Sequence, residues 1–206
     1  MIHLVDYNAG NVTSVRRALT SLALDSRLTA DPDELLTASR IIFPGVGHAA
    51  TAMAVLRERG LDEALVAAYK KGIPILGICV GSQVLLSKSE EGNCDGLDII
   101  PGQVKRFSFD DPTLKIPHMG WNSVDFVRPH PLFAGIKSGS DFYFVHSYYT
   151  VPESDSAVWA TCNYGIDFAC AVGHGNLFAT QFHCEKSGEA GLRILKNFAT
   201  WDGTAC

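Results

Sequence analysis

A cysteine that lies between two glycines, directly after a short apolar run, constrains this chain more than any other segment. The run Ile73-Pro74-Ile75-Leu76 has the composition of a buried strand, and Val84-Leu85-Leu86 has that of a helix start. Between them lies the heptapeptide Gly77-Ile78-Cys79-Val80-Gly81-Ser82-Gln83. A cysteine at a strand-to-helix turn is the thiol counterpart of a nucleophile elbow, where glycines let backbone pass close to backbone. The segment therefore predicts a strand, a sharp turn that carries a thiol, and a helix.

The position of Cys79 in this turn favours a reactive thiol. A helix N-terminus carries a partial positive charge, which stabilises a thiolate relative to a thiol. The backbone amide of Val80 is expected to point in the same direction, where it can bind an oxyanion. The alternative is a small apolar cysteine packed beneath a tight turn, with no chemical role.

The rest of the first half alternates strand and helix patterns. Val12, Val15, Leu19 and Leu22 share one helical face, and Asp31-Pro32-Asp33-Glu34 has the residues of a helix start. The expected strands are 2–6, 41–43 and 73–78, and the expected helices are 12–24, 48–58, 61–71 and one that begins at Asp31. Units that alternate in this way imply a parallel sheet covered by helices on both faces.

The second half is richer in strand patterns. The expected strands are 142–147, 157–162, 167–172 and 176–182, followed by a helix over roughly 188–201. Turn residues at 163–165 and 173–175 are expected to join hairpins. We therefore predict one domain over 1–206, an α/β fold of three layers. Its central sheet is expected to be mostly parallel and flanked by helices, with an antiparallel extension in the second half.

The overall composition excludes several classes of protein. The chain has 206 residues, of which 47% are hydrophobic and 19% charged, and this suits a compact domain with a sizeable core. A net charge of -5 gives no electrostatic support for a nucleic-acid partner. No apolar run reaches the length of a membrane span, and the first residues enter a strand without a signal-peptide pattern. We expect no membrane association.

The six cysteines do not form a metal or redox motif. None of them is spaced as CxxC, which argues against a zinc finger or a thioredoxin-like site. A chain of this length does not need disulfides, so we expect a cytoplasmic protein with reduced thiols. The phosphate-binding patterns GxxxxGK and GxGxxG are also absent from the sequence. We therefore expect neither a cofactor nor a metal.

A catalytic thiol needs a base, and His183 is the informative candidate among the seven histidines. It stands in Gln181-Phe182-His183-Cys184-Glu185, after the expected strand 176–182. Residues two apart on a strand face the same side, so His183 and Glu185 can emerge together and the carboxylate can fix the imidazole tautomer. The alternative is a surface His-Glu pair. A zinc deaminase would need a PCxxC motif after the HxE motif, and none follows, so Cys184 is expected to be an incidental neighbour.

Taken together, these segments identify a resemblance to the class I (triad-type) glutamine amidotransferases. The family-wide blocks are Pro44–Gly47, Gly77–Gln83 and Gln181–Ser187. Three further blocks resemble those of one branch, the glutaminase subunits of imidazole glycerol phosphate synthase: Asp6–Asn11, Pro117–Asn122 and Phe144–Tyr148. The blocks run in order through nearly the whole chain.

The resemblance implies a role for each matching residue. Cys79 would attack the carboxamide of L-glutamine, His183 would move the proton, and Glu185 would orient His183. A γ-glutamyl thioester would form, ammonia would leave, and water would release glutamate. The oxyanion hole is expected at the backbone of Val46, Gly47 and Val80, and the substrate-binding residues are expected to be Gly47, Gln83, Ser147 and Tyr148.

The resemblance also implies a partner. Ammonia would pass to a (β/α)₈-barrel cyclase in a heterodimer that makes imidazole glycerol phosphate and aminoimidazole carboxamide ribotide. The aromatic, nearly uncharged segments 117–122 and 142–149 have the composition of an interface core, although ordinary buried core has the same composition. The residues expected at the interface are Asn11, Met119, Trp121, Asn122 and Lys186.

The sequence departs from the family pattern at two places. Cys184 stands where the family usually has proline, whose loss could loosen the segment that carries His183. Val80 and Ser82 stand where leucine and methionine are more frequent. Three alternative functions stay open at this point: the glutaminase subunit of a pyridoxal phosphate synthase, a cysteine peptidase or stress-response protein of related fold, and a non-catalytic scaffold.

Overall fold

A computed structural model describes residues 1–8 and 11–204 of the chain, so Ala9 and Gly10 of the block 6–11, and Cys206, lie outside the described residues. In the first half the elements are β1 (Ile2–Val5), α1 (Val12–Ser21), β2 (Ser26–Thr29), α2 (Pro32–Leu35), β3 (Arg40–Gly45), α3 (Ala49–Glu58), α4 (Leu61–Lys70), β4 (Ile75–Cys79) and α5 (Val80–Gln83). The strands of this half lie in parallel in the order β2-β1-β3-β4.

In the second half β-structure dominates. Its elements are β5 (Leu86–Ser89), β6 (Cys94–Asp95), β7 (Ile100–Arg106), β8 (His118–Phe126), β9 (Ser140–His146), β10 (Tyr148–Pro152), β11 (Val158–Asn163), β12 (Asp167–His174), β13 (Leu177–Thr180) and α6 (Gly188–Thr200), with short 3₁₀ turns η1 (Pro131–Phe133), η2 (Asp155–Ala157) and η3 (Cys184–Lys186). Strand β13 returns to the centre and pairs in parallel with β4. It also pairs antiparallel with β12, so it joins the two halves into one sheet.

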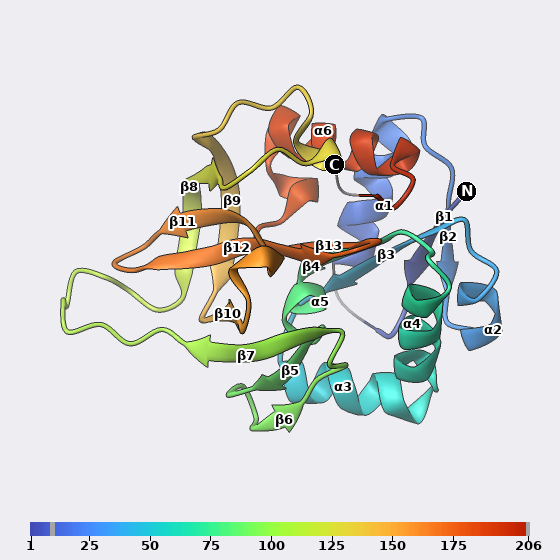
Figure 1. Cartoon of the computed structure of the whole chain (residues 1–206), viewed down its shortest axis with the longest axis horizontal. Helices are drawn as coiled ribbons and strands as arrows, with labels where there is room; N and C mark the ends of the chain where they lie inside the picture. The colour runs from blue at the N-terminus through green and yellow to red at the C-terminus, as the bar shows by residue number, and fades with distance from the viewer. Residues whose placement is uncertain (9–10, 205–206) are drawn as a thin grey trace.

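Helices cover both faces of the parallel part of the sheet. Figure 1 shows α1 and α6 above the sheet and α3 and α4 below it, while β7 to β12 extend to the left. Strands β1 and β4 are buried along their whole length, as expected for strands covered on both faces. The predicted α/β fold, mostly parallel with an antiparallel extension, is confirmed. The assignment of the whole chain to one domain stays a prediction.

Most predicted elements occur close to their expected positions. Asp31 caps α2 by accepting a hydrogen bond from the amide of Asp33 at 2.9 Å, with Pro32 at the first helical position. Strands β11 and β12 form the hairpin expected around 163–165, and β12 and β13 form the one expected around 173–175. The first helix ends at Ser21 rather than at residue 24, because the chain turns there into the edge strand β2.

The helix expected to begin at Val84 is a wrong prediction. The helical segment α5 begins at Val80, directly after Cys79, and ends after a single turn. The carbonyl groups of Val84 and Leu85 then accept hydrogen bonds from Leu97 and from Ile99 and Ile100, at 2.7 to 3.1 Å. Because these distant amides replace the next helical turn, the chain runs into β5 instead.

The strands β2, β5, β6, β7, β8 and β10 were not predicted from the sequence. Strand β8 shows why, because its burial alternates while its exposed face carries Met119 and Trp121, which are 62% and 58% exposed. Apolar residues on the outer face hide the period-2 pattern that identifies a half-buried strand.

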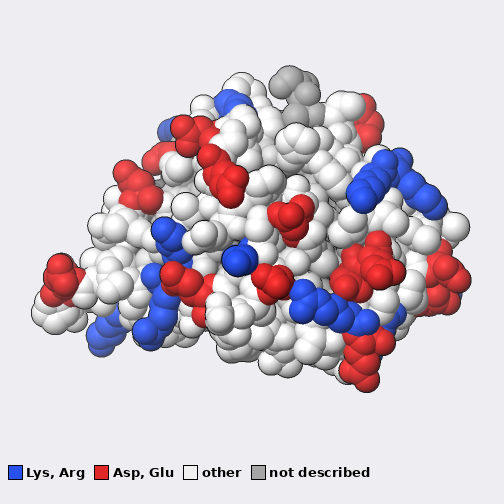
Figure 2. All heavy atoms as spheres, turned by 60° about the horizontal axis from the view of Figure 1, so that its bottom comes forward, with Lys and Arg blue, Asp and Glu red and all other residues white. Residues whose placement is uncertain are grey.

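The surface carries both signs of charge. On the face that Figure 2 shows, acidic and basic side chains lie side by side. None of the helices in the described part of the chain has the length and apolar composition that crossing a bilayer requires. The five cysteines at 79, 94, 162, 170 and 184 are all free thiols.

Candidate active site

The turn at Cys79 is a strained elbow, as the sequence predicts. Cys79 ends β4 with φ 56° and ψ −112°, a conformation that L-residues rarely adopt. The glycines on either side are needed for space. A Cβ on Gly81 would lie 2.0 Å from the carbonyl oxygen of Phe43 in β3, and a Cβ on Gly77 would lie 2.9 Å from Leu85. The hydroxyl of Ser82 donates to the Cys79 carbonyl at 2.7 Å. Ser82, which departs from the family pattern, thus forms a hydrogen bond within the turn.

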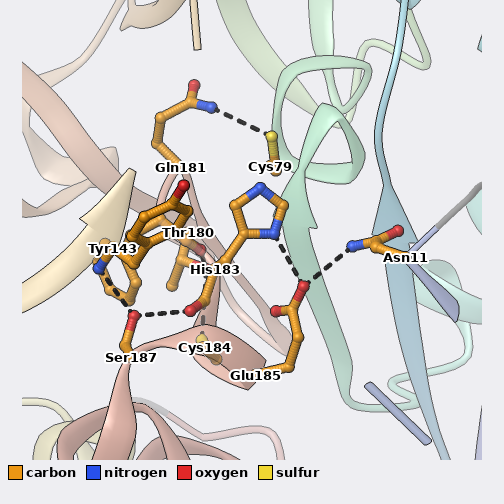
Figure 3. A network of polar contacts seen from close by, with 10 residues as sticks. Asn11, Cys79, Tyr143, Thr180, Gln181, His183, Cys184, Glu185 and Ser187 are labelled. Carbon is orange, nitrogen blue, oxygen red and sulfur yellow. Dashed lines mark hydrogen bonds and ion pairs between the residues drawn. The ribbon is translucent and has the colours of Figure 1, made fainter. Parts of the chain in front are cut away.

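The one-turn length of α5 changes the argument about the thiol. A single helical turn sums few peptide dipoles, so its N-terminus provides little stabilisation of a thiolate. The charged group that accompanies the thiol is instead His183. Figure 3 shows the ring of His183 between Cys79 and Glu185, with one nitrogen directed at each.

His183 and Glu185 form a fully buried pair. The Nδ1 atom of His183 and Oε1 of Glu185 are 2.8 Å apart, and both side chains are completely shielded from solvent. The predicted pairing is present, but its expected cause is wrong. Strand β13 ends at Thr180, and Glu185 lies in the 3₁₀ turn η3, so a tight turn and not strand alternation brings the carboxylate under the imidazole.

The surroundings of His183 favour its protonated form. Burial by itself lowers the pKa of the imidazole, but interactions with Cys79 and Glu185 outweigh burial and raise the pKa to about 10. These interactions favour an imidazolium in the place between Glu185 and Cys79. Such a ring can give up a proton on the side that faces Cys79.

The backbone of His183 is held by residues that the sequence did not single out. Its amide donates to the carbonyl of Tyr143 in β9 at 2.9 Å, and its carbonyl accepts from the hydroxyl of Ser187 at 2.6 Å. The Ser187 hydroxyl in turn accepts from the amide of Tyr143 at 2.9 Å. This loop of hydrogen bonds fixes the segment without the proline that the family usually has at 184.

Asn11 lies in the site rather than on the surface. It is only 4% exposed, and its side-chain amide donates to Oε1 of Glu185 at 3.3 Å. The sequence suggested Asn11 as an interface residue, so its contact with the carboxylate is a different role. Asn11 and Glu185 are 174 positions apart, and no local pattern relates them.

A second amide pair lies on the other side of Cys79. The side-chain nitrogen of Gln83 donates to the Tyr148 carbonyl and to Oε1 of Gln181, both at 3.0 Å. The side-chain nitrogen of Gln181 then lies 3.7 Å from the Cys79 sulfur. Both glutamines are buried. Gln181 belongs to the family-wide block Gln181–Ser187, but sequence reasoning predicted no role for its side chain.

Cys79, Gln83 and His183 lie at the wall of a cavity of about 290 Å³. It is lined by Val46, Gly47, Cys79, Val80, Gln83, Glu91, Pro117, Val145, His146, Ser147, Tyr148 and His183. Every residue expected in the oxyanion hole or the substrate pocket is therefore at this cavity. Gly47 has φ +98°, which favours glycine, and a Cβ built there would meet no atom within 4 Å.

Glu91 was missed by sequence reasoning. It brings a carboxylate to the cavity wall, and its Oε2 accepts a hydrogen bond from the amide of Ala49 at the start of α3, at 2.7 Å. No spacing in the sequence relates it to Cys79. Among the described residues no group of three His, Cys, Asp or Glu side chains is arranged to hold a metal ion.

The other residues expected at an interface differ in exposure. Met119 and Trp121 are large, apolar and mostly exposed on one face of β8. Lys186 is exposed, with its ammonium 5.7 Å from the centre of the Tyr143 ring. Asn122 is half-buried and donates to the carbonyl of Asn163 at 2.9 Å.

Comparison with known sequences gives a consistent result. Residues 3–201 match the family described as glutamine amidotransferase class-I. The imidazole glycerol phosphate synthase subunit HisH of Moorella thermoacetica is 50% identical over 198 residues, covering 96% of this chain and 93% of that protein. The protein of the same name from Chromobacterium violaceum is 46% identical over 209 residues, covering 98% of each.

Solved structures share the fold at much lower identity. A structure described as a glutamine amidotransferase covers 99% of this chain and all of its own, with a TM-score of 0.76 and 18% identity. The PurLQS structure from Thermotoga maritima covers 96% of each chain, with a TM-score of 0.75 and 18% identity. At this identity the likeness supports the fold alone.

Proposed function

Since this chain belongs to the class-I glutamine amidotransferase family and is an enzyme of that type, we propose that it is the glutaminase subunit of an imidazole glycerol phosphate synthase. One observation carries the proposed chemistry: the imidazole of His183 lies between Cys79 and the carboxylate of Glu185, and both Cys79 and His183 line one cavity. The near full-length identity to HisH subunits supports the choice of branch within the family.

The first half of the reaction uses the proton on His183. The Cys79 thiolate attacks the carboxamide carbon of L-glutamine, a C–S bond forms, and the carbonyl electron pair moves onto oxygen. Backbone amides at Val80 and at the turn that holds Val46 and Gly47 stabilise this oxyanion. His183 then protonates the amide nitrogen, the C–N bond breaks, and ammonia leaves from a γ-glutamyl thioester.

The second half returns the enzyme to its starting state. Water attacks the thioester carbon while His183 accepts a proton, and the C–S bond breaks to release glutamate and the Cys79 thiolate. Glu185 keeps Nδ1 of His183 hydrogen-bonded, so that the opposite nitrogen faces the reacting atoms throughout. The sum is glutamine plus water giving glutamate plus ammonia.

The cavity wall has groups suited to the rest of the substrate. The carboxylate of Glu91 can pair with the α-ammonium group of glutamine. Both side-chain N–H groups of Gln83 donate hydrogen bonds within the protein, to Tyr148 and to Gln181. Its side-chain oxygen has no such bond among the described residues and can therefore accept one from the substrate. Gly47, Ser147 and Tyr148 contribute backbone to the same wall.

The ammonia is proposed to serve a second protein. A (β/α)₈-barrel cyclase would dock on the face that carries Met119, Trp121 and Lys186 and convert the ammonia into imidazole glycerol phosphate and aminoimidazole carboxamide ribotide. Exposed Met and Trp side chains of this kind are typical of interface cores. We place this chain in the cytoplasm, where the free thiols of its described cysteines would stay reduced.

Cys79→Ala tests the separation of the two reactions. In the reconstituted complex, the variant is expected to abolish glutamine hydrolysis while it still binds the cyclase. The complex should keep its reaction with free ammonium salts, because that reaction does not need the thiol. Loss of both activities in a complex that still assembles would contradict separate sites.

Activation by the partner tests the proposed assembly. Glutamine turnover by the isolated chain is expected to be slow and to rise when the cyclase and its nucleotide ligand are added, since free ammonia would otherwise be wasted. Copurification of a barrel cyclase from the source cell would support the pairing. Full activity of the isolated chain, with no change on addition of the cyclase, would contradict it.

A further inference from the structure

A buried pair of histidines lies behind the wall of the cavity. His118 in β8 and His146 in β9 face each other across the antiparallel pair, and they are 3% and 5% exposed. Nδ1 of His118 is 2.9 Å from Nε2 of His146, and Nδ1 of His146 is 2.7 Å from the Tyr148 carbonyl. The triad chemistry uses neither side chain, yet His146 borders the cavity.

The side chain of Asn122 fixes one end of this chain of hydrogen bonds. Its Oδ1 accepts from the backbone amide of Ser123 at 2.9 Å, and its nitrogen donates to the backbone carbonyl of Asn163. Because these backbone groups have fixed donor and acceptor roles, the amide can have only one orientation. The same nitrogen lies 3.3 Å from Nε2 of His118 and must be the donor there.

The other end is fixed as well, since the Tyr148 carbonyl can only accept. His118 therefore accepts at Nε2 and carries its proton on Nδ1, and this proton is donated to Nε2 of His146. His146 likewise carries its proton on Nδ1 and donates it to Tyr148. Both rings must be neutral, and burial lowers the pKa of His118 to about 4 and that of His146 to about 3.

The Tyr148 carbonyl is the point where this chain meets the catalytic groups. It accepts from His146 and also from Gln83, whose second N–H is donated to Gln181. Gln181 is left with its nitrogen toward the Cys79 sulfur. The position of one backbone carbonyl thus sets how the side chains of both glutamines are oriented beside Cys79.

We propose that Asn122, His118 and His146 are positioning residues for glutamine hydrolysis, acting as one hydrogen-bonded chain whose proton direction holds the Tyr148 carbonyl in place. This inference rests on the proposed function, because it concerns the pocket that would bind glutamine. It also connects β8, which carries Met119 and Trp121 on its exposed face, with the wall of that pocket.

The tautomers of the two histidines can be measured without any assay of activity. Long-range ¹H–¹⁵N correlation spectra of the full chain labelled at histidine are expected to show both rings neutral and protonated on Nδ1 at pH 7. The variant Asn122→Asp keeps the side-chain shape but replaces the donor with an acceptor. It is expected to move the proton of His118 to Nε2 or to leave that ring charged. Protonation of either ring on Nε2 in the unsubstituted chain would overturn the proposal.

Two variants at position 146 test the effect on the pocket in the assembled enzyme. His146→Leu removes the donor, whereas His146→Asn keeps an N–H group near the place of Nδ1. We expect His146→Leu to raise the KM for glutamine by about tenfold, the size of one lost hydrogen bond to a buried carbonyl. His146→Asn should restore most of this loss, and both should leave the ammonium-dependent reaction unchanged. Equal losses in the two variants, or no loss in either, would overturn the proposal.

The two proposals can fail separately. If the unsubstituted complex did not hydrolyse glutamine, the proposed function would be wrong whatever the histidine spectra show. If it hydrolysed glutamine while the tautomers differed from Nδ1–H, the positioning chain would be wrong and the proposed function would stand.

Discussion

The elbow at Cys79 requires glycine at position 81, because a Cβ atom there would clash with neighbouring backbone. Gly81 has a neighbour, the Phe43 carbonyl, that would lie 2.0 Å from any added Cβ. Strand β3 pairs with β4 at this point and cannot withdraw without breaking the parallel ladder. The strained Cys79 conformation is thus maintained by close packing of two backbones.

Gly81→Ala is expected to destabilise the chain by about 3 kcal/mol or more, because the clash is with backbone that cannot move aside. Chemical denaturation measures the free energy of unfolding. Gly72→Ala is the matched control: its φ is +80°, but no atom lies within 4 Å of the added Cβ, so only the backbone cost of about 1–2 kcal/mol applies. Equal losses in the two variants would contradict the steric explanation.

Cys184 replaces the proline common in the family without loosening His183. It is fully buried at the start of η3, and its sulfur lies 3.5 Å from the hydroxyl of Thr180, on the side of His183 away from Cys79. Among the described residues its backbone amide donates no hydrogen bond to another main-chain group. A proline there would therefore remove no backbone hydrogen bond.

Cys184→Pro is accordingly expected to change the free energy of unfolding by no more than about 1 kcal/mol, since lost packing of the thiol offsets the reduced freedom of the unfolded chain. Glutamine turnover should be retained. Thermal unfolding and a glutaminase assay are the measurements. A loss of activity by about tenfold or more would mean that Cys184 takes part in placing His183.

At the scale of elements, the β8–β9 pair and the turns beside it bury histidines as neutral groups. His130 caps η1 by accepting from the amide of Leu132 at 3.1 Å, and it packs against Trp159 and Phe178. Burial, together with the charge of Arg128, lowers its pKa to about 4. With His118 and His146, three buried imidazoles therefore have native pKa values below the ordinary 6.5.

This arrangement predicts a loss of stability in mild acid. Because the unfolded chain binds protons near pH 6.5 and the native histidines bind them only near pH 4 or below, the free energy of unfolding falls as pH decreases from about 6.5 to 4. Each histidine contributes on the order of 1–3 kcal/mol to this fall. Denaturant titrations at several pH values measure it. His130→Asn keeps a capping acceptor but does not titrate, so it should reduce the slope, and an unchanged slope would contradict the assignment.

At the scale of the whole molecule, one sheet connects the proposed catalytic residues with the proposed partner face. Strand β13 joins the parallel half, which provides Cys79, to the antiparallel half, which provides β8, β9 and the Tyr148 carbonyl. The segment after β13 carries His183 and Glu185. A partner bound on β8 would therefore contact an element that is connected by hydrogen bonds to the proposed glutamine pocket.

If the proposed cyclase binds this face, Met119→Ser and Trp121→Ser are expected to weaken its binding about tenfold or more, because large apolar side chains at the centre of an interface dominate its affinity. Both side chains are exposed in the free chain, so its free energy of unfolding should change by only about 0.5 kcal/mol. Val127→Ser is the control, since Val127 is also apolar and 54% exposed but lies beyond the end of β8. Equal effects of all three on affinity would argue against a specific face.

The sequence alone was sufficient to predict the elbow, the His183–Glu185 pair and the α/β class. Each of these depends on residues that are close in sequence or on a repeating pattern of apolar residues. Tertiary structure decided what surrounds them. Asn11 reaches Glu185 across 174 positions, and Gln181 reaches Cys79 across 102. Tertiary structure also limits the helix after Cys79 to one turn. Amides of β7 and of the loop before it donate hydrogen bonds to the carbonyls that would otherwise accept within a longer helix. Such contacts arise when the sheet closes, and no local pattern encodes which distant groups will meet.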